Sequence, residues 1–287
     1  MENLFDAHFD GGEYEEYIPN TKHQWNEAKL HQKISNLAQV IREMDADIIA
    51  LEEVENEKVL LLLNKELGAK AYPYHFFPLK KERVSVESAL LSRFPITHTN
   101  SMLIKNQSRG IHRVVVMVEK QPLVLFLNHW PAQKERVEER MAYALALNSM
   151  LRHEGKSEYI LLGDFNSPYY IQKDDWGTAL VRLLQSGDKG ALHYNLWYEL
   201  PENKRFSHVY GKHKEALDHL LISSTLHDEQ GIEYKIHSFA VFTRAYMLDE
   251  KGYPKRWQIS ERGKGEHLGF GFSDHLPITA TFQILTH

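Results

Sequence analysis

The residues with the clearest chemical potential stand where apolar runs end. The run Tyr159-Ile160-Leu161-Leu162 predicts a buried strand, and Gly163 then lets the backbone turn into Asp164 and Asn166. Side chains two positions apart on an extended segment share one side, so this carboxylate and this amide should converge. A second polar segment, Ser273-Asp274-His275, directly precedes the apolar residues 276–278. Carboxylate, amide and imidazole groups at strand ends are what metal-assisted phosphoryl chemistry requires.

Three further polar residues follow the same pattern. Glu53 ends the apolar run 48–51, and His129 ends the run 123–127, where it could donate to a phosphoryl oxygen or a leaving group. Asp218 lies within the apolar run 216–222, where a buried carboxylate is costly unless it is paired. We expect His275 to be its partner, with Asp218 fixing the tautomer of that imidazole and raising its pKa.

Each residue also has a structural alternative. Glu53 could be a solvated carboxylate, His129 a histidine packed on Trp130, Asp164 and Asn166 parts of an Asx turn, and Asp274 a capping residue. Five such features in one chain favour a shared chemical role. Strand alternation places the neighbouring Glu52 and His219 on the opposite faces from Glu53 and Asp218.

Composition bounds the chemistry. The chain has 287 residues, of which 43% are hydrophobic, enough for one large domain or two small ones. A net charge of −5 argues against a globally basic nucleic-acid surface, although a local patch remains compatible with it. The absence of cysteine excludes disulfides, thiolate nucleophiles and Cys-based metal sites. A metal would use oxygen or imidazole ligands, which favours Mg, Mn or Ca over Zn.

The pattern along the chain predicts a layered α/β fold with mixed sheets. Helical spacing covers 24–44, 56–67, 132–153 and 177–185. Strands are predicted over 48–51, 73–78, 86–92, 101–104, 112–118, 122–128, 158–163, 206–210, 216–223, 232–240 and 277–284. A long loop spans 248–271. No apolar stretch is long enough to span a membrane. The start lacks a signal peptide, which predicts a cytoplasmic protein, an exported form with a removed leader being the alternative.

Six blocks carry a family resemblance, and together they span essentially the whole chain. They are residues 48–56, 89–96, 128–131, 163–168, 217–219 and 273–278. In this order they resemble the endonuclease/exonuclease/phosphatase superfamily, which includes exonuclease III-like and pancreatic deoxyribonuclease-like enzymes. The versions at 51–56 and 128–131 are most similar to bacterial members of undefined substrate.

The resemblance implies a fold and a set of roles. The fold would be a four-layered α/β sandwich, two mixed β-sheets packed face to face with helices outside, forming a single domain over 1–287, and we expect a monomer. The implied metal ligands are Glu53 and Asp274. The implied catalytic residues are Asp164, which positions or activates water; Asn166 and His275, which contact the phosphate; Asp218, which orients His275; His129, the second histidine; and Glu87, which steadies His129.

Two positions depart from the family pattern. A glutamine usually precedes the metal-ligand glutamate, and Glu52 stands there instead. The family motif also opens with an asparagine just before the position that Met1 occupies, and Asn3 does not match it. Either the native chain extends upstream of Met1 and supplies this asparagine, or a chain that begins at Met1 lacks it, and for that form we expect weakened metal binding and impaired catalysis.

The predicted function is metal-dependent hydrolysis of a phosphate ester by direct water attack, with Mg as the expected ion and Mn or Ca as substitutes. A phosphodiesterase or nuclease is favoured. The alternatives are hydrolysis of an inositol phosphate or phospholipid head group, and a catalytically impaired phosphate-binding member. Nucleic acid would need a local groove, for which the candidate residues are Lys80, Lys81, Arg83, Arg109 and Arg113. Tyr169, Tyr170 and Trp176 would stack on a base or a sugar, or else cap the core.

Overall fold

The chain divides into two compact units in the computed structural model. The first comprises Met1–Arg93 and Thr243–Leu276, and the second comprises Phe94–Phe242 and Pro277–His287. The structure describes residues 1–79, 84–105, 107–184 and 193–285. Because each unit joins segments that are distant in sequence, its core depends on contacts across the chain rather than on one contiguous stretch.

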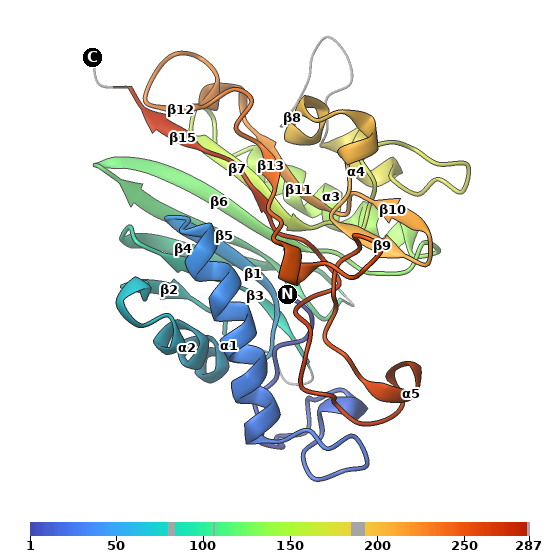
Figure 1. Cartoon of the computed structure of the whole chain (residues 1–287). Helices are drawn as coiled ribbons and strands as arrows, with labels where there is room; N and C mark the ends of the chain where they lie inside the picture. Colours follow the sequence, from blue (N-terminus) through green and yellow to red (C-terminus); the bar gives the residue numbers. More distant parts are fainter. Residues whose placement is uncertain (80–83, 106, 185–192, 286–287) are drawn as a thin grey trace. The chain divides into compact units, whose positions relative to one another are not determined.

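A three-stranded antiparallel sheet organises the first unit. Its strand order is β1 (Ile48–Val54), β3 (Glu87–Ser92) and β2 (Tyr74–Phe76). Helices α1 (Glu27–Met44) and α2 (Glu57–Glu66) run beside this sheet (Figure 1). Each helix begins with an asparagine N-cap: the side chain of Asn26 accepts from the backbone of α1, and that of Asn56 from the backbone of α2. The described part of this unit also contains three 3-10 turns and the short α5 (Ser260–Gly263).

The core of the first unit combines aliphatic and aromatic layers. One face of α1 buries residues at helical spacing, and they pack with Ile49 and Leu51 of β1. An aromatic group lies in the same core; its members are Phe5, Tyr17, Trp25 and Trp257. The N-terminal segment joins the sheet through Leu4, which forms a parallel bridge with Val54.

A six-stranded mixed sheet organises the second unit. Its order is β4 (Ile96–Leu103), β5 (Gly110–Val118), β6 (Gln121–His129), β7 (Glu158–Asp164), β11 (Asp218–Ile222) and β8 (Tyr194–Asn195). Only the β6–β7 pair is parallel among these described neighbours. A parallel pair needs a crossover connection, and α3 (Val137–Leu151) supplies it. Figure 1 shows α3 and α4 (Thr178–Leu183) in this part of the chain, and both helices contribute to one core with β6 and β7.

The predicted helices and most predicted strands are confirmed, with boundaries that shift by a few residues. Two predicted strands are wrong as continuous elements. Residues 232–240 form β12 (Ile232–Tyr234) and β13 (Ala240–Val241), and residues 277–284 form β14 (Ile278–Thr279) and β15 (Phe282–Ile284). Because His237 has a positive φ of 62°, the chain turns there, and the separated halves pair as β12–β15 and β13–β14.

The strand predicted over 206–210 is one half of a hairpin whose other half was not predicted. The hairpin consists of β9 (His208–Tyr210) and β10 (His213–Glu215), whose second strand has no apolar residue to give an alternating signal. The chain therefore has a mixed α/β fold with several sheets. None of the helices in the described parts of the chain has the length and apolarity required to cross a membrane.

Candidate active site

One rung of the large sheet aligns three of the predicted residues. In the parallel β6–β7 pair His129 lies opposite Asp164, and in the antiparallel β7–β11 pair Asp164 lies opposite Asp218. Neighbouring strands are about 4.8 Å apart. The Nε2 atom of His129 lies 3.9 Å from Oδ2 of Asp164. Sheet register therefore brings an imidazole and two carboxylates from three strands together.

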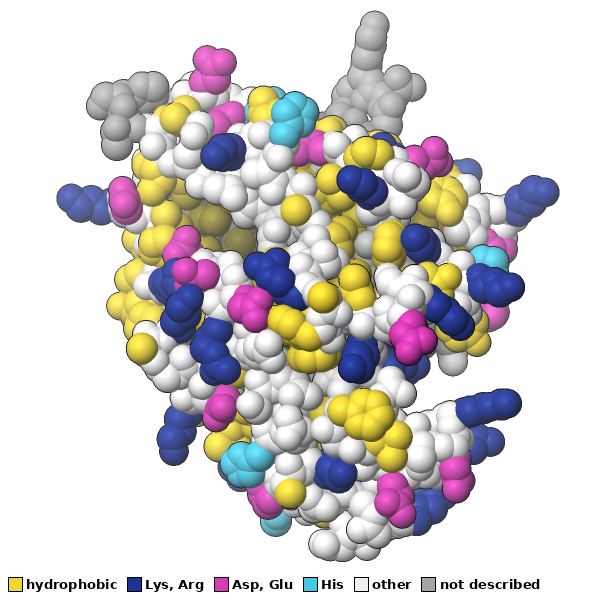
Figure 2. Space-filling model, in the orientation of Figure 1, with side chains coloured by type: hydrophobic (Ala, Val, Ile, Leu, Met, Phe, Trp, Pro, Cys, Tyr) yellow, Lys and Arg dark blue, Asp and Glu magenta, His cyan; other side chains and the backbone are white. Residues whose placement is uncertain are grey.

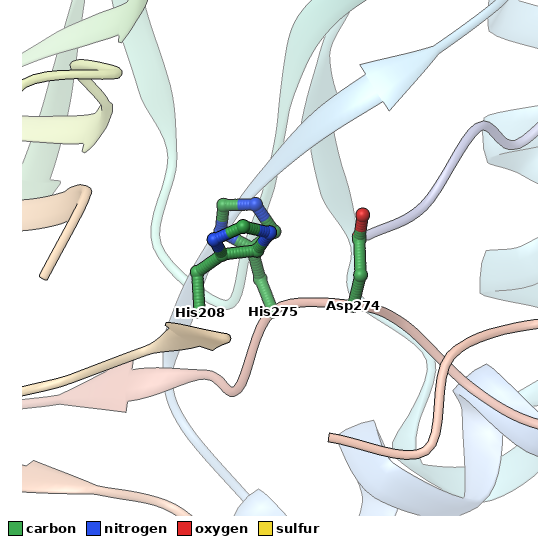
Figure 3. Close-up of side chains that lie close together, drawn as sticks. All are labelled: His208, Asp274 and His275. Atoms are coloured by element: carbon green, nitrogen blue, oxygen red, sulfur yellow. The ribbon is translucent and has the colours of Figure 1, made fainter. Parts of the chain in front are cut away.

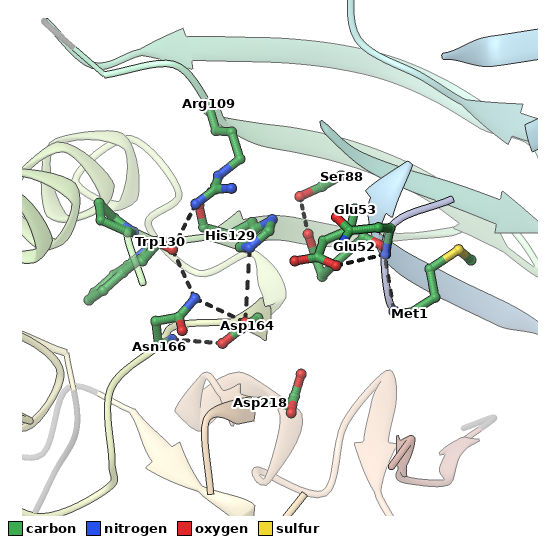
Figure 4. A network of polar contacts seen from close by, with 12 residues as sticks. Met1, Glu52, Glu53, Ser88, Arg109, His129, Trp130, Asp164, Asn166 and Asp218 are labelled. Carbon is green, nitrogen blue, oxygen red and sulfur yellow. Dashed lines mark hydrogen bonds and ion pairs between the residues drawn. The ribbon is translucent and has the colours of Figure 1, made fainter. Parts of the chain in front are cut away.

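The turn after β7 folds Asn166 back onto Asp164 (Figure 4). The Asn166 backbone N–H donates to Asp164 Oδ1 at 2.7 Å, and its side-chain Nδ2 donates to Oδ2 at 3.0 Å. The same Nδ2 donates to the carbonyl of Trp130 at 3.0 Å. Asn166 adopts a φ of 45°, which asparagine tolerates better than most residues. The carboxylate and the amide therefore converge, as predicted, and they do so through an Asx turn.

Asp218 has a partner that the sequence did not indicate. The hydroxyl of the buried Ser207 donates to Asp218 Oδ2, and the Trp197 indole N–H donates to the Asp218 carbonyl at 2.7 Å. A serine just before a short strand carries no distinctive signal, which explains the omission. The predicted pairing of Asp218 with His275 stays a prediction.

His219 points into the core, as strand alternation predicted. Its ring is fully buried, with Nε2 donating to the Ser167 carbonyl at 2.7 Å and Nδ1 accepting from Asn195 at 2.9 Å. Burial lowers the pKa of His219 to about 4. This histidine is therefore a neutral structural group.

The two arginines of the predicted groove are already engaged. Arg109 donates to the backbone carbonyls of His129 (3.2 Å) and Trp130 (3.1 Å), so it fixes the end of β6. Arg113 forms a two-point ion pair with the buried Glu154, at 2.6 and 3.0 Å. Lys80, Lys81 and Arg83 lie outside the described residues. Arg109 and Arg113 therefore give no support to the predicted nucleic-acid groove.

Glu53 occupies an irregular point of β1 in the first unit. The β1–β3 register shifts between Leu51 and Val54, and Glu53 has a positive φ of 61°. Its Oε2 accepts the backbone N–H of Asn3 at 2.8 Å. The neighbouring Glu52 is buried and accepts from the Ser88 hydroxyl of β3 (Figure 4). The two carboxylates have separate partners, which agrees with the prediction that they point to opposite sides.

A buried lysine supports the segment that contacts Glu53. Lys33 is fully buried, and its Nζ donates to the Asn3 carbonyl at 2.9 Å and to the Tyr17 hydroxyl at 3.2 Å. The ammonium also lies 5.1 Å from the ring centroid of Tyr17 and 5.2 Å from that of Trp257. Burial lowers its pKa to about 8, while the charges of Glu2, Glu53 and Asp274 oppose this shift. The sequence feature that could have indicated this buried residue is a lysine on the apolar face of the helix predicted over 24–44.

Asp274 and His275 extend from one loop segment of the first unit (Figure 3). The His275 backbone N–H donates to the Ser273 hydroxyl at 3.1 Å. Arg256 lies between two carboxylates: its Nη2 is 2.6 Å from Glu2 Oε1 and 3.9 Å from Asp274 Oδ2. Burial, followed by the charge of Asp274, raises the pKa of Glu2 to about 6.

The predicted residues divide between the two units. The first unit holds Glu53, Glu87, Asp274 and His275, and the second holds His129, Asp164, Asn166 and Asp218. Glu87 is buried on β3, where it is the register partner of Val54. The link predicted between Glu87 and His129 stays a prediction.

The donors around Glu53 fit a hard divalent cation. The Asn3 side-chain Oδ1 is a buried acceptor without a hydrogen-bond partner, while the backbone N–H of the same residue contacts Glu53. A buried carbonyl oxygen beside a carboxylate is the type of donor that Mg²⁺ and Ca²⁺ prefer. Oxygen donors in this part of the first unit are therefore compatible with the predicted ion.

A model of the endonuclease/exonuclease/phosphatase family matches residues 1–283. The chain belongs to that family. It is accordingly a hydrolase, a phosphoesterase of this family, whose members typically use divalent metals. No sequence among the curated proteins matches the chain.

Several solved structures share this fold at low sequence identity. Danio rerio TDP2, in complex with a single-strand DNA product, has 16% identity and a TM-score of 0.63, covering 89% of this chain and 93% of that one. A truncated Caenorhabditis elegans TDP2 has 16% identity and a TM-score of 0.61, covering 89% and 92%. A family protein from Leptotrichia buccalis has 15% identity and a TM-score of 0.59, covering 92% and 97%. At these identities the similarity describes the fold.

Proposed function

We propose that this protein hydrolyses phosphodiesters by direct attack of water, with Mg²⁺ as the ion and Mn²⁺ or Ca²⁺ as substitutes. The observation that carries the proposal is the alignment of His129, Asp164 and Asp218 on one rung of the sheet, with Asn166 folded onto Asp164. This rung belongs to a chain whose family performs phosphoester hydrolysis. The four-layered sandwich, the single domain over 1–287 and the monomeric state are further proposals, and the first two rest on family membership.

The proposed roles follow the chemistry of each group. Asp164 accepts a proton from water and orients it in line with the leaving oxygen. His129, beside it, protonates or hydrogen-bonds the leaving oxygen, and Glu87 steadies this histidine. Glu53 and Asp274 would hold the ion, which when bound neutralises charge developing on the phosphoryl oxygens. His275 contacts the phosphate, and Asp218 orients it.

The role of Asn166 has a specific requirement. Its side-chain amide has two N–H donors, and both have acceptors: the Trp130 carbonyl and Asp164 Oδ2. Asn166 can donate to a phosphoryl oxygen only by giving up one of these bonds. The bond to Asp164 is the one that would be exchanged, since a carboxylate that accepts a proton from water becomes a weaker acceptor.

The substrate class follows from one comparison. A relative of the same fold, Danio rerio TDP2, was solved with a single-strand DNA product. We therefore favour a nucleic-acid phosphodiester over an inositol phosphate or a phospholipid head group. Comparing turnover of single-stranded DNA, RNA, inositol phosphates and sphingomyelin, with each metal, ranks these candidates.

The direct test replaces Asp164 by Asn. We expect hydrolysis of bis(4-nitrophenyl) phosphate in Mg²⁺ to fall by about 10³-fold, in the range of a lost general base, with an unchanged thermal unfolding midpoint. The matched control is Asp228→Asn, at an exposed aspartate of the same unit. Near-normal hydrolysis by the Asp164 variant would remove the basis of the proposal. Absence of turnover in the parent chain with all three metals would favour the phosphate-binding alternative.

A further inference from the structure

An open pocket of about 830 Å³ lies in the second unit and has no role in the chemistry described above. Ligand pockets commonly measure about 300–1,000 Å³. Its lining comes from three segments of the chain: Lys134, residues 170–174 and residues 212–215. Four lysines and two acidic residues line it, so the pocket is locally positive in a chain with a net charge of −5.

The charge of this pocket is a local feature. On the face drawn in Figure 2, Lys and Arg side chains are interspersed with Asp and Glu. Within the pocket, the acidic Glu215 has an ammonium neighbour of its own, with Lys134 Nζ 3.9 Å from its Oε1. Lys173, Lys212 and Lys214 are exposed at the pocket wall. The pocket therefore presents ammonium groups to an anionic ligand.

The pocket also presents an aromatic side chain. Tyr170 is 48% exposed, and the adjacent Ile171 is 37% exposed. The other two aromatic residues of this segment, Tyr169 and Trp176, are buried, at 8% and 3%. Of the three rings, two therefore cap the core and Tyr170 alone remains available to a ligand. A positive groove combined with an exposed ring is the arrangement that binds single-stranded nucleic acid.

The pocket wall is continuous with the Asp164 turn. Lys134 Nζ lies 4.3 Å from the ring centroid of Trp176, and the indole N–H of Trp176 donates to the Asn166 carbonyl at 2.9 Å. On the other side, Glu215 on β10 precedes Asp218 by three residues. A nucleic-acid strand bound in the pocket would therefore continue toward the rung that carries Asp164.

Backbone geometry holds Tyr170 in place. Gly177, which precedes α4, has a φ of 97°, and a Cβ built there would lie 2.1 Å from the Tyr170 carbonyl oxygen. Gln172 and Trp176 close the same segment, with the Gln172 N–H donating to the Trp176 carbonyl at 2.9 Å. The segment is compact, so the exposed ring stands on a defined support.

We propose that this pocket binds the backbone phosphates and one base of a single-stranded nucleic acid, next to the phosphodiester that is cleaved. The proposal rests on the proposed function for the identity of the neighbouring site, but binding can be measured without turnover. The lysines contact phosphates, and Tyr170 stacks on a base.

The test measures binding of a short fluorescein-labelled oligothymidylate by anisotropy, in EDTA so that no hydrolysis occurs. The pocket variant combines Lys173→Gln, Lys212→Gln and Lys214→Gln. For a single strand, the slope of log K against log salt falls by about 0.7 for each phosphate that the protein no longer neutralises, so the slope should decrease by about 2. A separate Tyr170→Leu variant should weaken binding about tenfold with little change of slope.

The control variant removes the same charge elsewhere in the same unit. It combines Lys120→Gln, Lys156→Gln and Lys235→Gln, all exposed; Lys120 and Lys156 precede β6 and β7, at the ends opposite His129 and Asp164. The control should keep the parent slope. Equal losses in both triple variants, or no binding by the parent chain, would overturn the proposal.

Two further measurements separate the possible failures. Hydrolysis of bis(4-nitrophenyl) phosphate, which has no nucleic-acid backbone beyond its single phosphodiester, should be unchanged in the pocket variant. If the parent chain binds the oligonucleotide through the pocket but hydrolyses no ester, the proposed function fails and the pocket stands. If the pocket variant loses affinity for inositol hexakisphosphate while retaining the oligonucleotide, the pocket proposal fails.

Discussion

The two units hold their candidate residues by different means. In the second unit, sheet register aligns His129, Asp164 and Asp218, and the positions follow from backbone pairing. In the first unit, Glu53 lies at an irregular point of a strand and depends on the N-terminal segment, which Lys33 in turn supports. The first arrangement rests on the pairing of neighbouring strands. The second depends on a single buried charge.

The largest expected effect is therefore in the first unit. Lys33→Met removes the buried ammonium and leaves the carboxylates of Glu2, Glu53 and Asp274 without it. Removing one partner of a buried charge group typically costs about 3–5 kcal/mol. We expect a loss of about 3 kcal/mol in the free energy of unfolding measured with urea. Lys58→Met, at an exposed position of α2, is the control and should change stability by less than about 0.5 kcal/mol. Equal stability of the two variants would show that the Lys33 ammonium does not stabilise the first unit.

A pH effect of intermediate size tests a feature that the units share. His267 in the first unit repeats the arrangement of His219 in the second: Nδ1 accepts from the Trp257 indole N–H at 2.8 Å, and Nε2 donates to the Glu16 carbonyl at 2.7 Å. Burial lowers the pKa of each histidine to about 4. Both rings stay neutral in the folded protein over the range in which an unfolded histidine becomes charged.

The sign of the effect follows from these pKa values. Because the folded pKa lies below the unfolded value of about 6.5, stability is complete above that pH and is lost as the pH falls toward 4. Between pH 7 and pH 5 each histidine should cost about 2 kcal/mol. His219→Gln should flatten the dependence of stability on pH, whereas His98→Gln, at an exposed position, should leave it unchanged. Parallel pH curves for the two variants would contradict the assignment.

The smallest expected effect concerns Ser207. Ser207→Ala removes the donor to Asp218 Oδ2 while the register of β11 remains. We expect kcat for bis(4-nitrophenyl) phosphate to fall about tenfold, which corresponds to about 1.4 kcal/mol, with little change in KM. Ser207→Thr, which keeps the hydroxyl, should recover part of this loss. Ser224→Ala, at an exposed serine of the same unit, is the control. A rise in KM with an unchanged kcat would mean that Ser207 does not act through Asp218.

For the second unit, the sequence indicated the candidate site residues but not the residues that hydrogen-bond to them. Apolar runs ending in polar residues pointed to Asp164, Asn166 and His129 as candidates, and these lie close together because β6 and β7 are parallel and end at the same edge of the sheet. Ser207 and the polar β10 carried no periodic signal and were missed. The runs at 232–240 and 277–284 had strand composition, but the turn at His237 depends on backbone conformation that composition does not report.

In the first unit, the sequence pointed to Glu53 as a candidate but gave no sign of the residues that contact its surroundings. Lys33 shares the apolar face of α1 with Leu30, Ile34 and Leu37, and a lysine there usually places its ammonium in solvent. Its burial requires the aromatic rings of Tyr17 and Trp257, which come from distant parts of the chain. Contacts of this kind, between a buried ammonium and rings elsewhere in the sequence, cannot be recognised from the local sequence pattern.

The left-handed turn at Gly177 limits how the ligand selectivity of the pocket can be altered by substitution. Any side chain at position 177 would collide with the Tyr170 carbonyl, so the first turn of α4 and the segment that bears Tyr170 are sterically locked to each other. Substitutions at the tip of the ring can alter its contacts with a ligand. A shift of the ring itself would require both segments to change together, so selectivity at this point of the molecule should be adjusted by exchanging the whole 169–177 loop rather than by single replacements at its glycine.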